Sequence, residues 1–146
     1  MSQFEKLVRL REFELDERRR ESGNILNEVN MLQDEMNRLN ESLKVEQKIA
    51  SESLEARLLY NEFASSVIRQ REWLTAALKA KEEEYESSRE KVAHAYGEMR
   101  KAEIVRDEAL KAEKQRGQIL EQIEVDEIAQ NIYRRKIETL SPSLRT

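Results

Sequence analysis

The sequence is poor in the residues that make turns. Its 146 residues include only three glycines and one proline, Pro142, and no cysteine. A compact domain changes direction many times and relies on Gly and Pro to do so, so this scarcity excludes an ordinary α/β enzyme or a β-sandwich. Without cysteine the chain has no disulfides, thiolate nucleophiles or cysteine metal sites, which fits a reducing cytoplasm.

The sequence also lacks an excess of one charge and a long apolar run. It carries 30 acidic and 26 basic residues, for a formal net charge of -4. Nucleic-acid binding usually needs a basic excess, so we expect no nucleic-acid partner. The sequence is charged almost from its first residue and lacks an apolar h-region there, which predicts no signal peptide. No uncharged apolar stretch approaches the roughly 20 residues that span a bilayer.

Residues that could support catalysis or hold a metal or cofactor do not cluster. His94 is the only histidine, whereas a metal site needs several ligands at defined spacing. The three consecutive glutamates at 82–84 point in different directions on a helix and do not converge on one substrate. No glycine-rich phosphate loop is present. We therefore expect no enzyme, no metal and no cofactor, with His94 and these glutamates on solvated helix faces.

Helix-forming residues and a seven-residue repeat dominate what is present. Ala, Glu, Lys, Leu and Arg make up about 55% of the chain, a share typical of long helices and coiled coils. Two rows with a step of seven alternate at spacings of three and four, the a/d pattern of a coiled coil. The rows are Phe4, Arg11, Arg18, Ile25, Leu32, Leu39 and Glu46, and Val8, Leu15, Ser22, Val29, Met36, Leu43 and Ala50.

A second apolar stripe begins at Val67 and Leu74 and drifts onto Leu120, Ile123 and Ile128. Between the two stripes, over residues 54–68, the heptad pattern lapses. Ser65 and Ser66 stand just ahead of the second stripe, where serine can cap a helix N-terminus. The sequence therefore predicts an all-α, long antiparallel two-helix coiled-coil hairpin over residues 1–138.

Its predicted arms span about 3–58 and 66–136, joined by a turn near 60–66 and followed by a frayed tail over 139–146. The competing fold is one continuous helix that dimerises to bury its stripe.

The sequence contains more apolar and aromatic residues than one seam between two helices can bury. Near the N-terminus the set is Phe4, Leu7, Val8, Leu10, Phe13 and Leu15, and in mid-chain it is Tyr60, Phe63 and Trp73. Surplus apolar surface on a helix marks interaction sites, and Tyr and Trp are favoured interface anchors. Local packing explains the same residues equally well.

The two ends of the chain resemble the FliJ family, the small central-stalk protein of the bacterial flagellar export ATPase. The resemblance rests on Phe4-x-x-Leu7-x-x-Leu10-Arg11, on the run Leu15-Asp16-Glu17-Arg18-Arg19-Arg20, and above all on Val125-Asp126-Glu127-Ile128-Ala129. It implies a non-enzymatic stalk that inserts its terminal ends into a hexameric export ATPase. The rest of the stalk would contact the membrane export gate and export chaperones, peripheral to the cytoplasmic face of the inner membrane.

The resemblance also implies roles for individual residues. The ATPase ring would contact Phe4, Leu7, Leu10, Asp126 and Glu127. The export gate would contact a mid-chain row of apolar and aromatic residues, namely Tyr60, Phe63, Val67, Trp73 and Leu74. Two alternatives remain at this point, a generic dimerising scaffold coiled coil and the homologous stalk of a virulence type III secretion system.

Overall fold

Two long helices make up nearly all of the computed structural model, which describes residues 2–140. Helix α1 spans Gln3–Ala50 and helix α2 spans Leu54–Leu140, and residues 2–140 contain no strand. The chain divides into two units, a larger one over Arg9–Arg100 and a smaller one formed by Met1–Val8 with Lys101–Thr146. Of the predicted tail, Thr139 and Leu140 are still helical, and Pro142 lies outside the described residues.

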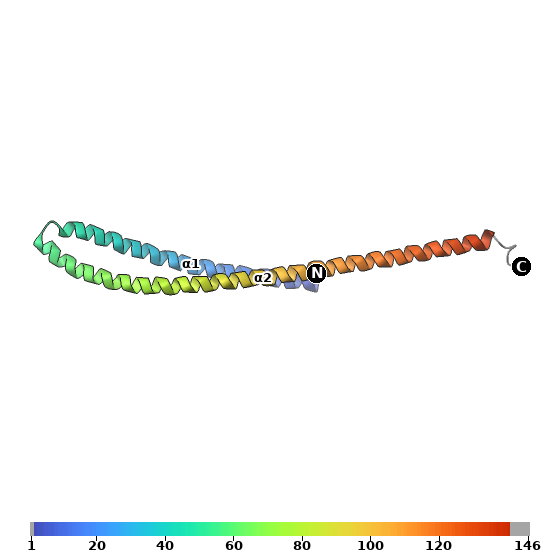
Figure 1. The fold of residues 1–146 in the computed structure, drawn as a ribbon, viewed down its shortest axis with the longest axis horizontal. Helices are drawn as coiled ribbons and strands as arrows, with labels where there is room; N and C mark the ends of the chain where they lie inside the picture. Colours follow the sequence, from blue (N-terminus) through green and yellow to red (C-terminus); the bar gives the residue numbers. More distant parts are fainter. Residues whose placement is uncertain (1, 141–146) are drawn as a thin grey trace. The chain divides into compact units, whose positions relative to one another are not determined.

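The larger unit is a helical hairpin in which α1 and α2 run antiparallel, side by side (Figure 1). Two contacts set the alignment of the helices. The hydroxyls of Ser22 and Ser88 lie 3.0 Å apart in a hydrogen bond, and the Lys81 ammonium pairs with the Glu28 carboxylate. The prediction of an all-α fold with two long helices packed together is confirmed, and the single continuous helix is wrong.

The seam between the helices repeats every seven residues. On α1 it buries Leu15, Ser22, Val29 and Ala50, and on α2 it buries Val67, Leu74, Ser88 and Ala95. The alignment of Ser22 with Ser88, continued in steps of seven, sets Leu15 opposite Ala95 and Met36 opposite Leu74. Each well-buried Leu or Val stabilises the hairpin by roughly 1.5 to 3 kcal/mol. The row that begins at Val8 is thus the buried one, and its predicted interruption at Ser22 is part of the packing.

The seam is graded in side-chain size. Near the turn, the alignment pairs Met36 with Leu74 and Leu43 with Val67, and Val67 and Leu74 are the most deeply buried large side chains. Towards the other end of the hairpin, Ser22 meets Ser88, and the partner of Leu15 is only an alanine. Less apolar area is therefore buried per layer far from the turn than near it.

The turn comprises only residues 51–53, so the predicted turn near 60–66 is wrong. The Ser53 hydroxyl accepts a hydrogen bond from the Ala56 backbone N–H at 3.1 Å, which makes Ser53 the N-cap of α2. The Ser51 hydroxyl donates to the Lys48 carbonyl at 2.7 Å. Ser65 instead lies inside α2 and donates to the Asn61 carbonyl at 3.0 Å, a bond that a serine can make within a helix. A serine therefore does cap the second helix, but the residue is Ser53 and not Ser65 or Ser66 as predicted.

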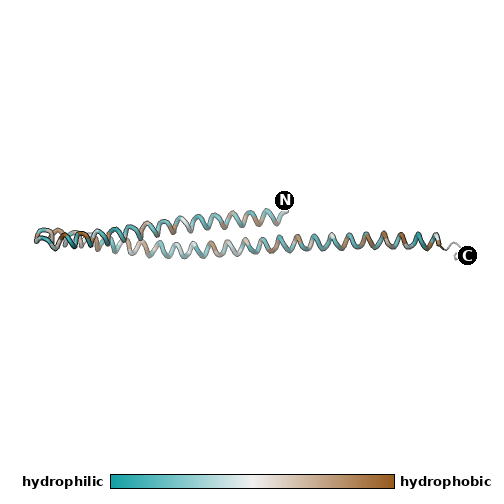
Figure 2. The backbone as a smooth tube through the Cα atoms, turned by 90° about the horizontal axis from the view of Figure 1, so that it is seen from above, coloured by the Kyte–Doolittle hydropathy of each residue, from teal (hydrophilic) through white to brown (hydrophobic). Residues whose placement is uncertain are grey.

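The smaller unit has little buried surface. Among its described residues, 2–8 and 101–140, only Val8 and Ala102 are buried, so the short N-terminal stretch packs beside Ala102. From residue 110 to residue 140 every side chain is exposed, although hydrophobic positions recur along this stretch (Figure 2). No part of α1 or α2 within residues 2–140 has both the length and the apolar character needed to cross a bilayer.

Candidate interaction surfaces

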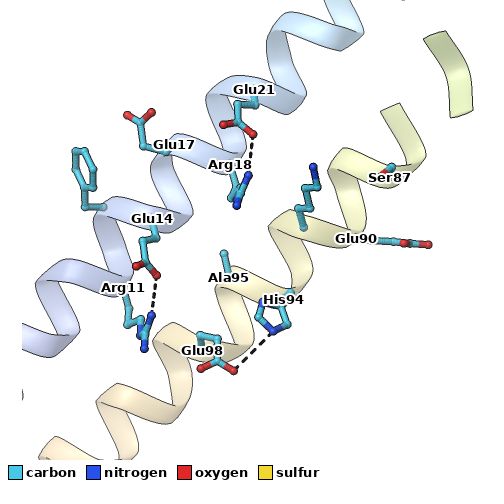
Figure 3. Close-up of a pocket in the computed structure, with 12 residues that line it drawn as sticks. Arg11, Glu14, Glu17, Arg18, Glu21, Ser87, Glu90, His94, Ala95 and Glu98 are labelled. Atoms are coloured by element: carbon cyan, nitrogen blue, oxygen red, sulfur yellow. Dashed lines mark hydrogen bonds and ion pairs between the residues drawn. The ribbon is translucent and has the colours of Figure 1, made fainter. Parts of the chain in front are cut away.

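One side of the hairpin carries a charged groove of about 750 Å³ between α1 and α2 (Figure 3). Its charges pair along each helix rather than converging. Arg11 donates to Glu14 at 2.9 Å and Arg18 to Glu21 at 3.2 Å, and the bond to Glu14, with the charge of that carboxylate, raises the pKa of Arg11. His94 is exposed, as expected, with its Nε2 3.9 Å from the Glu98 carboxylate. The groove is a solvated face and offers no convergent catalytic group.

Lys81 occupies a seam position and ties the two helices together. Its ammonium pairs with Glu28 on α1 and lies 3.1 Å from the Glu84 carboxylate on its own helix. The hydrogen bond to Glu28, followed by that to Glu84, raises the pKa of Lys81. Glu84, which the sequence placed on a solvated face with its neighbours, therefore also supports this cross-helix contact.

The residues predicted to contact the ATPase ring fall into separate places. Phe4 is 39% exposed, Leu7 is half-buried, and both belong to the smaller unit. Asp126 and Glu127 are exposed on α2, and the Asp126 carboxylate accepts a hydrogen bond from Gln122 at 3.0 Å.

Asp126 follows Ala102, the residue beside which the N-terminal stretch packs, by 24 positions. That separation is about 36 Å of helix, so Phe4 and Leu7 do not share one surface with Asp126. Leu10, which is exposed, belongs to the larger unit.

The residues predicted to contact the export gate do not form one exposed row. Val67 and Leu74 are each only 2% exposed and lie inside the seam, so they do not face a partner while the hairpin is closed. Tyr60 and Phe63 are half-buried, and only Trp73, at 66%, is well exposed. Val67 and Leu74 are heptad positions of the second apolar stripe, and the heptad marks the seam between the helices rather than the outer surface.

The exposed part of α2 carries apolar residues on two opposite sides, a feature that the sequence reasoning missed. At about 100° per residue, the directions of the two sets below differ by about 170°. The first set is Ile119, Leu120 and Ile123, and the second is Val125, Ile128 and Ile132; all six are between 52% and 61% exposed. In the sequence, the second apolar stripe shifts its position around the helix as it approaches Leu120. This shift marks where the seam between the helices ends.

Over residues 2–140 the fold defines an all-helical protein built from two long helices packed together. The sequence matches the family described as Flagellar FliJ protein over residues 1–138, so the chain belongs to the FliJ family. It is accordingly a component of the flagellar protein export apparatus, and its family is structural rather than enzymatic. No curated protein and no solved structure matched the chain.

Proposed function

We propose that the chain is the stalk of the flagellar export apparatus and couples the hexameric export ATPase to the membrane export gate. The exposed part of α2 enters the ATPase ring, and the hairpin contacts the gate and export chaperones. In this role the chain contributes no catalytic group of its own and works peripherally, at the cytoplasmic face of the inner membrane. Family membership alone names neither these partners nor the surfaces of the chain that contact them.

The observation that carries the proposal is the two-sided apolar surface around Ile123 and Ile128. A two-helix seam covers one face of a helix, because its contacts recur every three or four residues on that face. Apolar residues on opposite faces need cover on both sides at once. A ring that encloses the helix provides such cover, whereas one partner helix, as in a dimerising scaffold, covers only one of the two sides.

The ATPase contact is tested by steady-state hydrolysis with the purified cognate export ATPase. The full chain should raise the turnover rate, and Ile128→Lys and Asp126→Lys should remove most of that increase. Glu113→Lys is the matched control, because residue 113 lies on the same exposed helix but about 9 Å before Ile119, the first residue of the two apolar sets, and its variant should stimulate normally. If the wild-type chain changes neither the turnover nor the sedimentation of the ATPase, the ring contact is wrong.

The gate contact is best assigned to the outer face of α2 that bears Trp73. Leu59, 68% exposed, and Trp73 are 14 residues apart, close to four helical turns, so they lie on one face. Trp73 is the only tryptophan, so its fluorescence reports on this face directly. Adding the cytosolic part of the gate protein should shift the emission, and Leu59→Ala should weaken binding more than Ile68→Ala, an exposed residue on another face. An unchanged emission at saturating gate protein would rule out this face.

A further inference from the structure

The hairpin has a second groove, on the other side of the layers that hold Ser22 and Ser88. It has a volume of about 420 Å³ and follows α2 from Tyr85 to Tyr96, a length of about 16 Å or three helical turns. The charged groove of Figure 3 borders the same part of the seam and is lined by several carboxylates. The two sides of one stretch of hairpin therefore differ in chemistry.

The second groove has an apolar and aromatic wall. Leu26 from α1 and Tyr85, Val92 and Tyr96 from α2 line it, and Tyr96 is 50% exposed while Leu26 is 37% exposed. Its floor includes Gly23, and nothing lies within 4 Å of a Cβ placed on that glycine. The groove is thus open at a point where another backbone can approach closely.

Arginines supply the only charges in this groove. Arg19 and Arg89 line it, and none of the nine described lining residues is acidic. The Arg89 guanidinium lies 5.9 Å from the centre of the Tyr85 ring, which holds it at the groove edge by a cation–π contact.

Each arginine has one carboxylate neighbour on its own helix, Asp16 at 3.9 Å and Glu86 at 3.3 Å. These pairs are exposed and contribute little to stability. Both guanidinium groups can therefore turn to carboxylates of a partner at small cost.

We propose that this groove, from Arg19 to Leu26 on α1 and from Tyr85 to Tyr96 on α2, binds an amphipathic helix with acidic flanks. The apolar face of that helix packs on Leu26, Val92 and the tyrosines, and its carboxylates pair with the arginines in charge-assisted hydrogen bonds. Tyr and Arg are the residue types that most often dominate binding energy at interfaces. None of its residues is among those assigned above to the ring and gate contacts, so the proposal can be tested separately from them.

The experiment uses the full chain and two synthetic 18-residue helical peptides with the same leucine stripe at spacings of three and four. One peptide carries glutamate on both flanks and the other carries lysine. Fluorescence anisotropy of the labelled peptides should show the acidic peptide binding at least about tenfold more tightly, and Arg19→Glu with Arg89→Glu should reverse that preference.

Gly23→Met blocks the groove while leaving the hairpin intact, because the new side chain meets open space and glycine is a poor helix former. This variant should weaken binding of the acidic peptide at least about tenfold. Gly97→Met is the matched control: Gly97 also faces open space but lines neither groove, so binding should be unchanged. Equal binding of the two peptides, or full binding to Gly23→Met, would overturn the proposal. So would self-association of the wild-type chain that Gly23→Met abolishes in sedimentation, since the occupant would then be a second copy.

Discussion

Helix α2 contains two stretches of similar composition that behave differently. Over residues 67–95 the apolar residues in register with α1, namely Val67, Leu74 and Ala95, are buried, whereas over residues 110–140 every residue is exposed. Leu74 is 2% exposed and Leu120 is 60% exposed, although both are leucines in the same helix. The difference shows that apolar content alone does not make a seam; an apolar side chain becomes core only where a partner helix packs against it.

The largest test of this contrast compares the same substitution in the two stretches. Leu74→Ala removes a side chain from a fully packed layer and should lower the free energy of unfolding by about 2 to 5 kcal/mol. Leu120→Ala should change it by less than about 0.5 kcal/mol, as is usual for exposed positions. Urea unfolding followed by circular dichroism measures both. A similar loss for the two variants would mean that residues 110–140 are packed in solution.

Hydrogen exchange should separate the same two stretches without any substitution. Helices that lack tertiary packing are marginally stable and open often. Backbone amides of residues 117–133 should therefore exchange at least about 100-fold faster than those of residues 67–95 in the isolated protein, as read by mass spectrometry. Comparable protection from hydrogen exchange in both stretches would contradict the difference in packing between them.

The buried serine pair should contribute a smaller but measurable stabilisation. Ser88 donates to the Tyr85 carbonyl at 2.6 Å and also shares the hydrogen bond with Ser22. Ser88→Ala should cost about 1 kcal/mol of unfolding free energy, a typical net value for one hydrogen bond. Combining it with Ser22→Ala should cost less than the sum of the two single changes. Ser87→Ala, at the exposed neighbouring position, is the control and should be neutral; additive single changes would show that the hydroxyls do not interact.

The smallest expected effect is the pH dependence of the stability that Lys81 contributes. The pKa of Lys81 is raised in the folded state by Glu28 and Glu84, so its contribution to stability is fully present below the unfolded-state pKa. It is lost as the pH rises through the folded-state value. The wild type should be more stable than Lys81→Met at pH 8, and the difference in urea midpoint should vanish when Lys81 is deprotonated. Lys79→Met is the control; a difference that persists unchanged at high pH would exclude the ion pairs as its cause.

The sequence predicts the seam well because the seam depends on local periodicity. Val8, Leu15, Ser22 and Val29 were placed on one row and are all buried. The turn was misplaced because Ser53 and Ser65 have the same capping chemistry, and only the hydrogen bonds in the structure show that the helix begins after Ser53.

The exposed surfaces were harder to predict. Val67 and Leu74 were predicted to contact a partner, but the alignment of the two helices places both side chains inside the seam. Residues from both helices form the groove around Gly23, so no single stretch of sequence could predict it.

The gradation of the seam has a consequence for how the hairpin yields. Its layers near Leu74 join two large side chains, whereas Ser22 meets Ser88 and Leu15 meets only Ala95. A pull or twist that reaches the hairpin from the end far from the turn therefore meets layers with little buried apolar area before it reaches those of Leu74 and Val67. The hairpin should therefore separate first at the end that holds Leu15 and Ala95 and stay closed longest around Leu74 and Val67.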